Sequence, residues 1–293
     1  SEWVKQPDFG VTGTYPSLVC DPDDTLHVTY RGLSRPPQLA YQQKPKDGEW
    51  TDPRPLVDAG TEDGYTQFGN ALFVEPDGTL HLAFHVYDIH AERGHSAGYL
   101  RSEDGGDTWT LADGTPVELP MHPSDSGWVE QGDDLDMRVT NVACDADGNP
   151  YFVTSHYERE PKGGTLWRYE DGKWHETHLG PVVWEEYPDV NIVPGTICFD
   201  DDGILYVSVQ MSKLGGWGGP SDCEILVLTS GDGGETFRIA QVSHDAGEVG
   251  NWMPSFERFT GHNPVEDPGL IYIHGVRGTG LNDPAENEIR YLE

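Results

Sequence analysis

Basic side chains are scarce in this 293-residue sequence. It has 6 Lys and 12 Arg against 51 Asp and Glu, which gives a formal net charge of −33. Nucleic-acid binding depends on Lys and Arg that displace counterions from phosphates, so a nucleic acid is not an expected partner. The same charge disfavours an anionic membrane surface. No stretch approaches 18 apolar residues, so no membrane-spanning helix is expected either.

Cysteine is also scarce, with four residues, and their spacing is not of the metal-binding type. The acidic residues would suit calcium, but they show no ordered ligand spacing, so we predict no metal and no cofactor. The chain begins at Ser1 without a visible signal peptide. We expect a secreted or periplasmic monomer, and the acidic surface fits either a salty habitat or an ordinary acidic secreted protein.

Five segments of the chain share one pattern. Each has a short apolar strand, a tight turn of acidic residues and glycine, and a second strand with alternating hydrophobicity, which is typical of a β-hairpin. Further short strands follow each hairpin, at a repeat of about 60 residues, as in the four-stranded blades of a β-propeller. The hairpins lie at residues 15–30, 69–84, 140–154, 194–208 and 253–274.

The repeats predict an all-β fold, a five-bladed β-propeller of four-stranded antiparallel blades in a single domain over residues 1–293. Fourth strands are expected at residues 48–51, 107–110, 172–175 and 235–238. The fifth blade ends on its third strand, at residues 287–292, whereas residues 2–7 resemble an isolated fourth strand. We therefore predict that the N-terminal strand completes the last blade, which would close the ring and remove its open edges.

Two turns carry a more specific motif. Residues 102–109 match the Asp-box pattern Ser-x-Asp-x-Gly-x-Thr-Trp, and residues 230–237 match it with Phe in place of Trp. The aspartates of this motif accept backbone N–H groups within the turn, glycine supplies a positive φ, and the aromatic ring packs between sheets. Asp104 and Asp232 are therefore interpreted as turn-forming residues rather than catalysts.

With these motifs the sequence resembles the BNR/Asp-box repeat propellers, the superfamily that contains sialidases and propeller-type polysaccharide lyases such as ulvan lyases. Residues 13–17, 28–32 and 111–115 are closer to the lyase-like branch than to sialidases, and the Arg-Ile-Pro motif of sialidases is missing near the start. The resemblance implies a polysaccharide or oligosaccharide substrate. Known lyases of that branch have larger rings than the five units found here.

The predicted turns divide the two faces of the ring. The turns between first and second strands and between third and fourth strands are short and share one face, so the long connections share the other face. Function concentrates on loops held by a rigid scaffold, so we place the site on the long-connection face near the central axis. In the second strands, one column varies from blade to blade, as an asymmetric site requires. It contains Arg31, His85, Ser155, Gln210 and Val276.

The candidate residues follow from this placement. His85, His156 and Tyr157 are predicted to be the catalytic acid and base, with Tyr87 as a further candidate. The predicted substrate-binding residues comprise arginines that suit a carboxylate, aromatic rings that suit a sugar face, and one histidine. They are Arg31, Arg138, Arg277, Tyr15, Trp252 and His274.

Three functional hypotheses stay open. The first is a lyase that cleaves a uronate-containing polysaccharide by β-elimination, in which an arginine neutralises the carboxylate and a base removes the α proton. The second is a glycoside hydrolase, either sialidase-like or based on paired carboxylates, and the third is a propeller that binds glycans without cleaving them. The carboxylates considered for the second are Asp134, Asp136, Glu185, Glu186 and Asp189.

Overall fold

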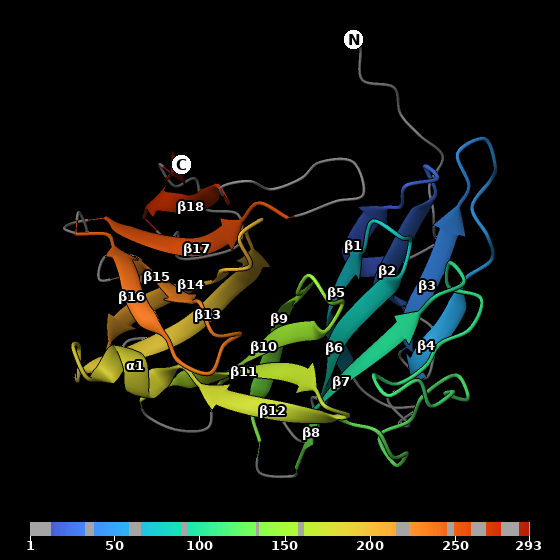
Figure 1. Cartoon of the computed structure of the whole chain (residues 1–293), viewed down its shortest axis with the longest axis horizontal. Helices are drawn as coiled ribbons and strands as arrows, with labels where there is room; N and C mark the ends of the chain where they lie inside the picture. Colours follow the sequence, from blue (N-terminus) through green and yellow to red (C-terminus); the bar gives the residue numbers. More distant parts are fainter. Residues whose placement is uncertain are drawn as a thin grey trace.

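The computed structural model of the chain is all-β, with five antiparallel sheets that follow one another around a ring from blue to red in Figure 1. The single helix in the described part of the chain, α1 (Gly180–Trp184), has one turn, and no described helix is long and apolar enough to cross a membrane. The structure describes residues 13–32, 38–58, 66–88, 93–132, 135–157, 161–214, 223–244, 249–258, 268–276 and 287–292.

Each sheet is one blade, and its strands are hydrogen-bonded in chain order. Blade one contains β1 (Gly13–Cys20), β2 (Leu26–Gly32), β3 (Gln38–Lys44) and β4 (Arg54–Asp58). Blade two contains β5 (Thr66–Val74), β6 (Leu80–Asp88), β7 (Arg93–Ser102) and β8 (Glu130–Gln131). Blade three contains β9 (Met137–Cys144), β10 (Pro150–His156), β11 (Gly163–Glu170) and β12 (Lys173–His178). Blade four contains β13 (Val190–Phe199), β14 (Leu205–Lys213), β15 (Glu224–Ser230) and β16 (Arg238–Val242), and blade five contains β17 (Gly250–Phe256), β18 (Leu270–Gly275) and β19 (Asn287–Leu292).

The five-bladed propeller predicted from the repeats is confirmed. The three-stranded state of blade five agrees with the missing fourth strand. The strand predicted to complete that blade, residues 2–7, lies outside the described residues, so closure of the ring stays a prediction.

Three of the four predicted fourth strands are displaced along the chain. In blade two, Thr110 forms only isolated bridges with Arg101 and Pro116, and the fourth strand is β8 instead. In blades one and four, the strand begins three or more residues after the predicted segment starts, because the turn first passes through an irregular stretch. Only β12 of blade three begins where the sequence pattern placed it, within one residue.

The core of the molecule lies between neighbouring blades. Each innermost strand packs against the next in chain order, in the pairs β1–β5, β5–β9, β9–β13 and β13–β17. Apolar side chains of adjacent blades interlock, as in the cluster of Leu39, Leu82 and Trp109 between blades one and two. Burial of such side chains stabilises each by roughly 1.5–3 kcal/mol relative to exposure. The ring therefore holds the blade ends at fixed relative positions.

Side chains also bond the backbone of one blade to that of the next. Ser17 Oγ accepts the Leu72 N–H (2.9 Å), and Thr196 Oγ1 accepts the Phe256 N–H (2.6 Å). The buried Asn141 amide binds both backbone groups of Ile197: its Oδ1 accepts the N–H (2.8 Å) and its Nδ2 donates to the carbonyl (2.9 Å). We call these contacts the inter-blade seams. They satisfy backbone groups that no ladder reaches.

The Asp-box turns have the expected structural role. In blade four, Asp232 Oδ1 accepts the backbone N–H groups of Glu235 and Thr236, and Oδ2 accepts the Thr236 hydroxyl. These hydrogen bonds, led by the one from the Thr236 hydroxyl, lower the Asp232 pKa to about 2. In blade two the equivalent turn buries Trp109, whose indole N–H donates to the Gly106 carbonyl (3.1 Å). The interpretation of these aspartates as turn-forming residues fits this geometry.

Candidate functional site

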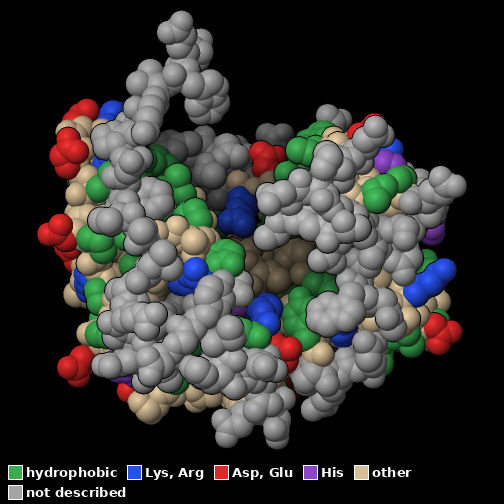
Figure 2. Space-filling view, turned by 180° about the vertical axis from the view of Figure 1, so that it is seen from behind, with side chains coloured by type: hydrophobic (Ala, Val, Ile, Leu, Met, Phe, Trp, Pro, Cys, Tyr) green, Lys and Arg blue, Asp and Glu red, His purple; other side chains and the backbone are tan. Residues whose placement is uncertain are grey.

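The antiparallel register brings the candidate residues to one end of the blades. First strands begin, and second strands finish, at the long-connection face, where Thr14 pairs with Arg31 and Arg138 with Ser155. In the face shown in Figure 2, the molecule is hollowed near its centre, and Lys or Arg side chains gather at the rim of the hollow while Asp and Glu are seen mainly at the periphery. The strong negative charge of the whole chain therefore does not extend uniformly over this face.

Arg138 is the centre of the best-defined group, between blades two and three. Its guanidinium lies over the Tyr87 ring (4.3 Å to the centroid) and near the Tyr157 ring (5.6 Å). Nη1 donates to Asp136 Oδ1 and to the Met137 carbonyl, both at 2.7 Å. Nε and Nη2 make no hydrogen bond to any described residue, and the side chain is 26% exposed. No described residue occupies this edge, and its geometry suits a planar anion such as a carboxylate.

Tyr157 follows directly after β10, beside Arg138. Its backbone N–H donates to the Asp136 carbonyl (2.7 Å), and its hydroxyl lies 3.4 Å from Ser155 Oγ. Gly94 of β7 makes the close packing of this corner possible, because a Cβ there would lie 2.1 Å from the Met137 carbonyl oxygen and 2.7 Å from Arg138 Nη1. The group therefore combines a fixed cation, two phenol rings and a partly exposed approach.

His85 adjoins this group but is buried, with 2% exposure. Its Nδ1 accepts the Val139 N–H (3.0 Å), so this side chain forms an inter-blade seam between blades two and three. Nε2 then carries the proton, and it makes no hydrogen bond to any described residue. Burial, and secondarily the Arg138 charge, lower the His85 pKa to about 3. This geometry does not suit an exposed acid or base, because one nitrogen is occupied and the other is shielded.

His156 points away from Tyr157, since neighbouring residues of a strand face opposite sides. Its Nε2 bonds Thr154 Oγ1 (2.9 Å) and lies 3.6 Å from Glu130 Oε2. His156 and Glu130 line a separate cavity of about 350 Å³ together with His178 and Trp184. His156 and Tyr157 therefore do not converge on one point, contrary to the arrangement that an acid–base pair would need.

The remaining described candidates lie elsewhere on this face. The Arg31 guanidinium lies over the Tyr15 ring (5.2 Å), and Tyr15 is 46% exposed with a positive φ of 56°. In blade five, His274 Nδ1 bonds Asn251 Oδ1 (2.8 Å), and Asn251 Nδ2 donates to Glu224 Oε2 (3.1 Å). Trp252 lies next to Asn251 in β17.

The structure thus sorts the predicted site residues into separate groups. Arg138 and Tyr157 lie together with His85 behind them, Arg31 pairs with Tyr15, and His274 is held by Asn251. Arg277 and Asp134 lie outside the described residues. Glu185, Glu186 and Asp189 are exposed near α1. Sequence reasoning missed the contributions of Glu130, Glu224 and Asn251, which recur in no motif and gain their partners only through folding.

Comparison with known families agrees with this architecture. The profile of the BNR repeat-containing family matches residues 3–181, which is more than half of the chain. The chain belongs to this family. A search of curated protein sequences found no match.

Several solved structures share the fold of this chain. An ulvan lyase of polysaccharide lyase family PL25 superposes with a TM-score of 0.70 at 12% identity over 94% of this chain, and it has also been solved bound to -[GlcA(1-4)Rha3S]-. This chain spans 64% of that lyase's length. The polysaccharide lyase Uly1 gives a TM-score of 0.60 at 14% identity, with 96% of this chain and 58% of that chain covered.

An α-L-arabinanase from Penicillium chrysogenum, solved with arabinobiose, gives 0.56 at 14% identity, with 96% and 82% covered. At these identities, all three likenesses show a shared fold.

Proposed function

We propose that the protein is a carbohydrate-active enzyme, a lyase that cleaves a uronate-containing polysaccharide by β-elimination. The observation that carries the proposal is the Arg138 guanidinium, which is held by Asp136 and two tyrosine rings and whose Nε–Nη2 edge is occupied by no described residue. That edge suits bidentate binding of a uronate carboxylate. The fold shared with an ulvan lyase that binds a glucuronate-containing glycan supports the same assignment.

Each group of the site has a role in this mechanism. Arg138 neutralises the carboxylate, which stabilises the negative charge that develops when the α proton is removed. Tyr157, whose ring lies beside Arg138 and whose hydroxyl lies near Ser155 Oγ, is assigned the proton transfers: its phenolate takes the α proton and then returns it to the leaving glycosidic oxygen. The glycosidic oxygen at the β carbon leaves with a proton, and a double bond forms between the α and β carbons. His85 is assigned as a positioning residue, because it fixes the Val139 amide directly after Arg138.

The proposal is tested on a panel of uronic-acid polysaccharides by following the near-ultraviolet absorbance of the unsaturated sugar. We expect product with the wild-type protein and a loss of about 10²-fold or more in kcat/KM for Tyr157→Phe, the range for loss of an acid–base group. Arg138→Lys should lose about 10²-fold, as when a transition-state donor is removed. Arg101→Lys, which changes an arginine paired with Glu103 at the opposite end of the blade, is the matched control and should retain activity.

Other outcomes select the remaining hypotheses. New reducing ends without absorbance would identify a hydrolase. Glycan binding without any turnover, unchanged in Tyr157→Phe, would identify a binding propeller. Silence across the whole panel would count against the lyase assignment.

A further inference from the structure

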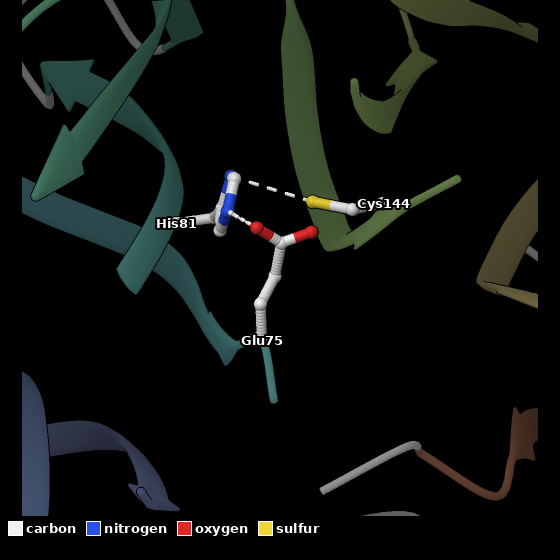
Figure 3. Close-up of side chains that lie close together, drawn as sticks. All are labelled: Glu75, His81 and Cys144. Carbon is white, nitrogen blue, oxygen red and sulfur yellow. Dashed lines mark hydrogen bonds and ion pairs between the residues drawn. The ribbon is translucent and has the colours of Figure 1, made fainter. Parts of the chain in front are cut away.

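A second cluster of chemically reactive side chains lies at the opposite, short-turn end of blades two and three. Glu75 follows β5, His81 lies in β6, and Cys144 ends β9 of the next blade. His81 Nε2 lies 3.1 Å from Glu75 Oε2, and the Cys144 thiol lies 3.3 Å from His81 Nδ1. Figure 3 shows the thiol and the carboxylate on the same side of the His81 ring. One ligand atom from each residue lies within 4.8 Å of the others.

Part of this cluster belongs to the propeller repeat. In blade one, His27 Nε2 likewise bonds the turn carboxylate of Asp21 (3.1 Å) and its Nδ1 bonds the Tyr41 hydroxyl (2.7 Å). The residue of the next blade that corresponds to Cys144 is Val74, so blade one has the same pair without a sulfur. The repeat therefore accounts for a histidine beside a carboxylate, but not for the thiol.

Glu75 departs from the repeat as well. At the equivalent positions, Asp21, Asp145 and Asp200 each use Oδ1 to accept backbone N–H groups of their own turn. The Glu75 carboxylate accepts no such hydrogen bond from the described residues, because in this turn Asp77 Oδ1 accepts the Thr79 N–H instead. The extra methylene of glutamate carries the carboxylate out of the turn and toward His81. A glutamate that departs from the repeat and a thiol supplied by the next blade thus meet beside the buried His81.

The chemistry of the three groups points to a metal ion. We propose that Glu75, His81 and Cys144 bind a zinc-like divalent cation that joins blades two and three. Nitrogen, thiolate sulfur and carboxylate oxygen are the ligands that zinc takes in proteins. With metal–nitrogen and metal–oxygen bonds of about 2.0–2.2 Å in a tetrahedron, the two ligand atoms would be about 3.3 Å apart, close to the observed 3.1 Å.

The surroundings of the cluster complete such a site. His81 is fully buried, and the Tyr99 hydroxyl bonds its Nδ1 (2.6 Å), which fixes the ring as an outer-shell partner does in metal sites. The metal would bind Nε2, beside Glu75, and the Cys144 thiol, which contacts Nδ1 in this structure, would turn toward Nε2 on binding. His81 Nε2, although close to Glu75, is not aligned for a hydrogen bond with any described residue. Glu75 and Cys144 line a cavity of about 330 Å³. The cavity provides an entry path and room for water as a fourth ligand.

The field at this point favours a cation. Asp145 follows Cys144 directly, so the carboxylates of Glu75 and Asp145 both place negative charge near the thiol. A divalent ion would displace the thiol proton on binding, as metals do at cysteine sites. The sequence alone did not indicate this site, because its ligands come from two blades and His81 and Cys144 are 63 residues apart.

Titration of the metal-free protein with Co²⁺ and Zn²⁺ tests the proposal. We expect one equivalent of Co²⁺ to produce thiolate-to-metal charge-transfer absorption in the wild-type protein, and Zn²⁺ to abolish it by competition and to raise the melting temperature. Cys144→Val, which copies the natural Val74, should lose the absorption, and Glu75→Gln should weaken Zn²⁺ binding at least about tenfold. Cys20→Val changes the corresponding thiol of blade one and should behave as wild type.

The circular dichroism spectra and the metal-free melting temperatures of the variants establish that each is folded. Charge-transfer absorption of wild-type strength in folded Cys144→Val, or its absence from the folded wild-type protein, would overturn the proposal. Equal Zn²⁺ affinity in wild type and Glu75→Gln would remove Glu75 from the ligand set and overturn the site as described.

Discussion

At the residue scale, His85 shows how one side chain can fit a functional pattern in the sequence and still serve the scaffold. It occupies the variable column of the second strands, where an asymmetric site is expected. The structure places its Nδ1 on the Val139 amide, 54 residues away, and buries the ring against Gly69, where a Cβ would lie 2.0 Å from the ring carbon Cε1. No pattern in the sequence predicts that contact, because it forms only when two blades pack together.

The pKa of His85 gives this interpretation a measurable consequence. The folded pKa is about 3, below the ordinary value of 6.5, so the neutral ring contributes stability that is fully present above pH 6.5 and is lost as the pH falls toward 3. The contribution is on the order of a few kcal/mol, at 1.36 kcal/mol for each pKa unit. In His85→Gln, the free energy of unfolding should therefore fall less steeply than in wild type between pH 6.5 and pH 4.

Urea unfolding across this pH range measures the difference, and His156→Gln, which changes a partly exposed histidine, is the control. An NMR titration adds an independent measurement, in which the His85 ring should not titrate between pH 5 and pH 8. A mid-range titration of His85 would instead restore it as a candidate acid or base.

At the element scale, the hairpins could be predicted because their turns and alternation are local, whereas the fourth strands could not be located closely. A strand such as β8 gains its place by pairing with β7 after a long excursion, and its two residues carry no periodicity of their own. The inter-blade seams were equally hidden. They depend on which backbone groups the first strands leave unpaired at irregularities such as the one between Pro194 and Ile197.

Among the inter-blade seams, the Asn141 contact gives the most direct prediction for the free energy of unfolding. It is 2% exposed and satisfies both backbone groups of Ile197, so Asn141→Ala would leave a buried donor and a buried acceptor without partners. Each unsatisfied group costs about 1–3 kcal/mol, and we expect a loss of roughly 2–5 kcal/mol in the free energy of unfolding. Chemical denaturation measures it. Asn149→Ala, which removes one contact to Asp145 in a partly exposed turn, should cost less than about 1 kcal/mol. Equal losses of unfolding free energy in the two variants would show that the Asn141 contact stabilises the protein no more than an ordinary turn contact does.

At the scale of the whole molecule, the carboxylates that produce the net charge of −33 have different roles. Some carboxylates form turns, as Asp21, Asp145 and Asp232 do, and the proposed metal site would use Glu75. The site proposed for the uronate instead depends on a single well-held arginine, within a face where basic side chains gather around the hollow. A polyanionic glycan thus meets long-range repulsion from the protein and short-range attraction at its site.

These two forces respond differently to salt. Raising NaCl from about 10 mM to about 100 mM shortens the Debye length from about 30 Å to about 10 Å, which screens the distant carboxylates far more than a cation in contact with the substrate. We expect kcat/KM on a uronate polysaccharide to rise over this interval, mainly through a lower KM, and to fall only at higher salt, where the Arg138 contact is screened as well. A short oligosaccharide of the same repeat should show a smaller rise, because it carries fewer charges into the repulsive field. A monotonic fall from the lowest salt would mean that the basic side chains around the hollow, and not the net charge, govern the approach of the substrate.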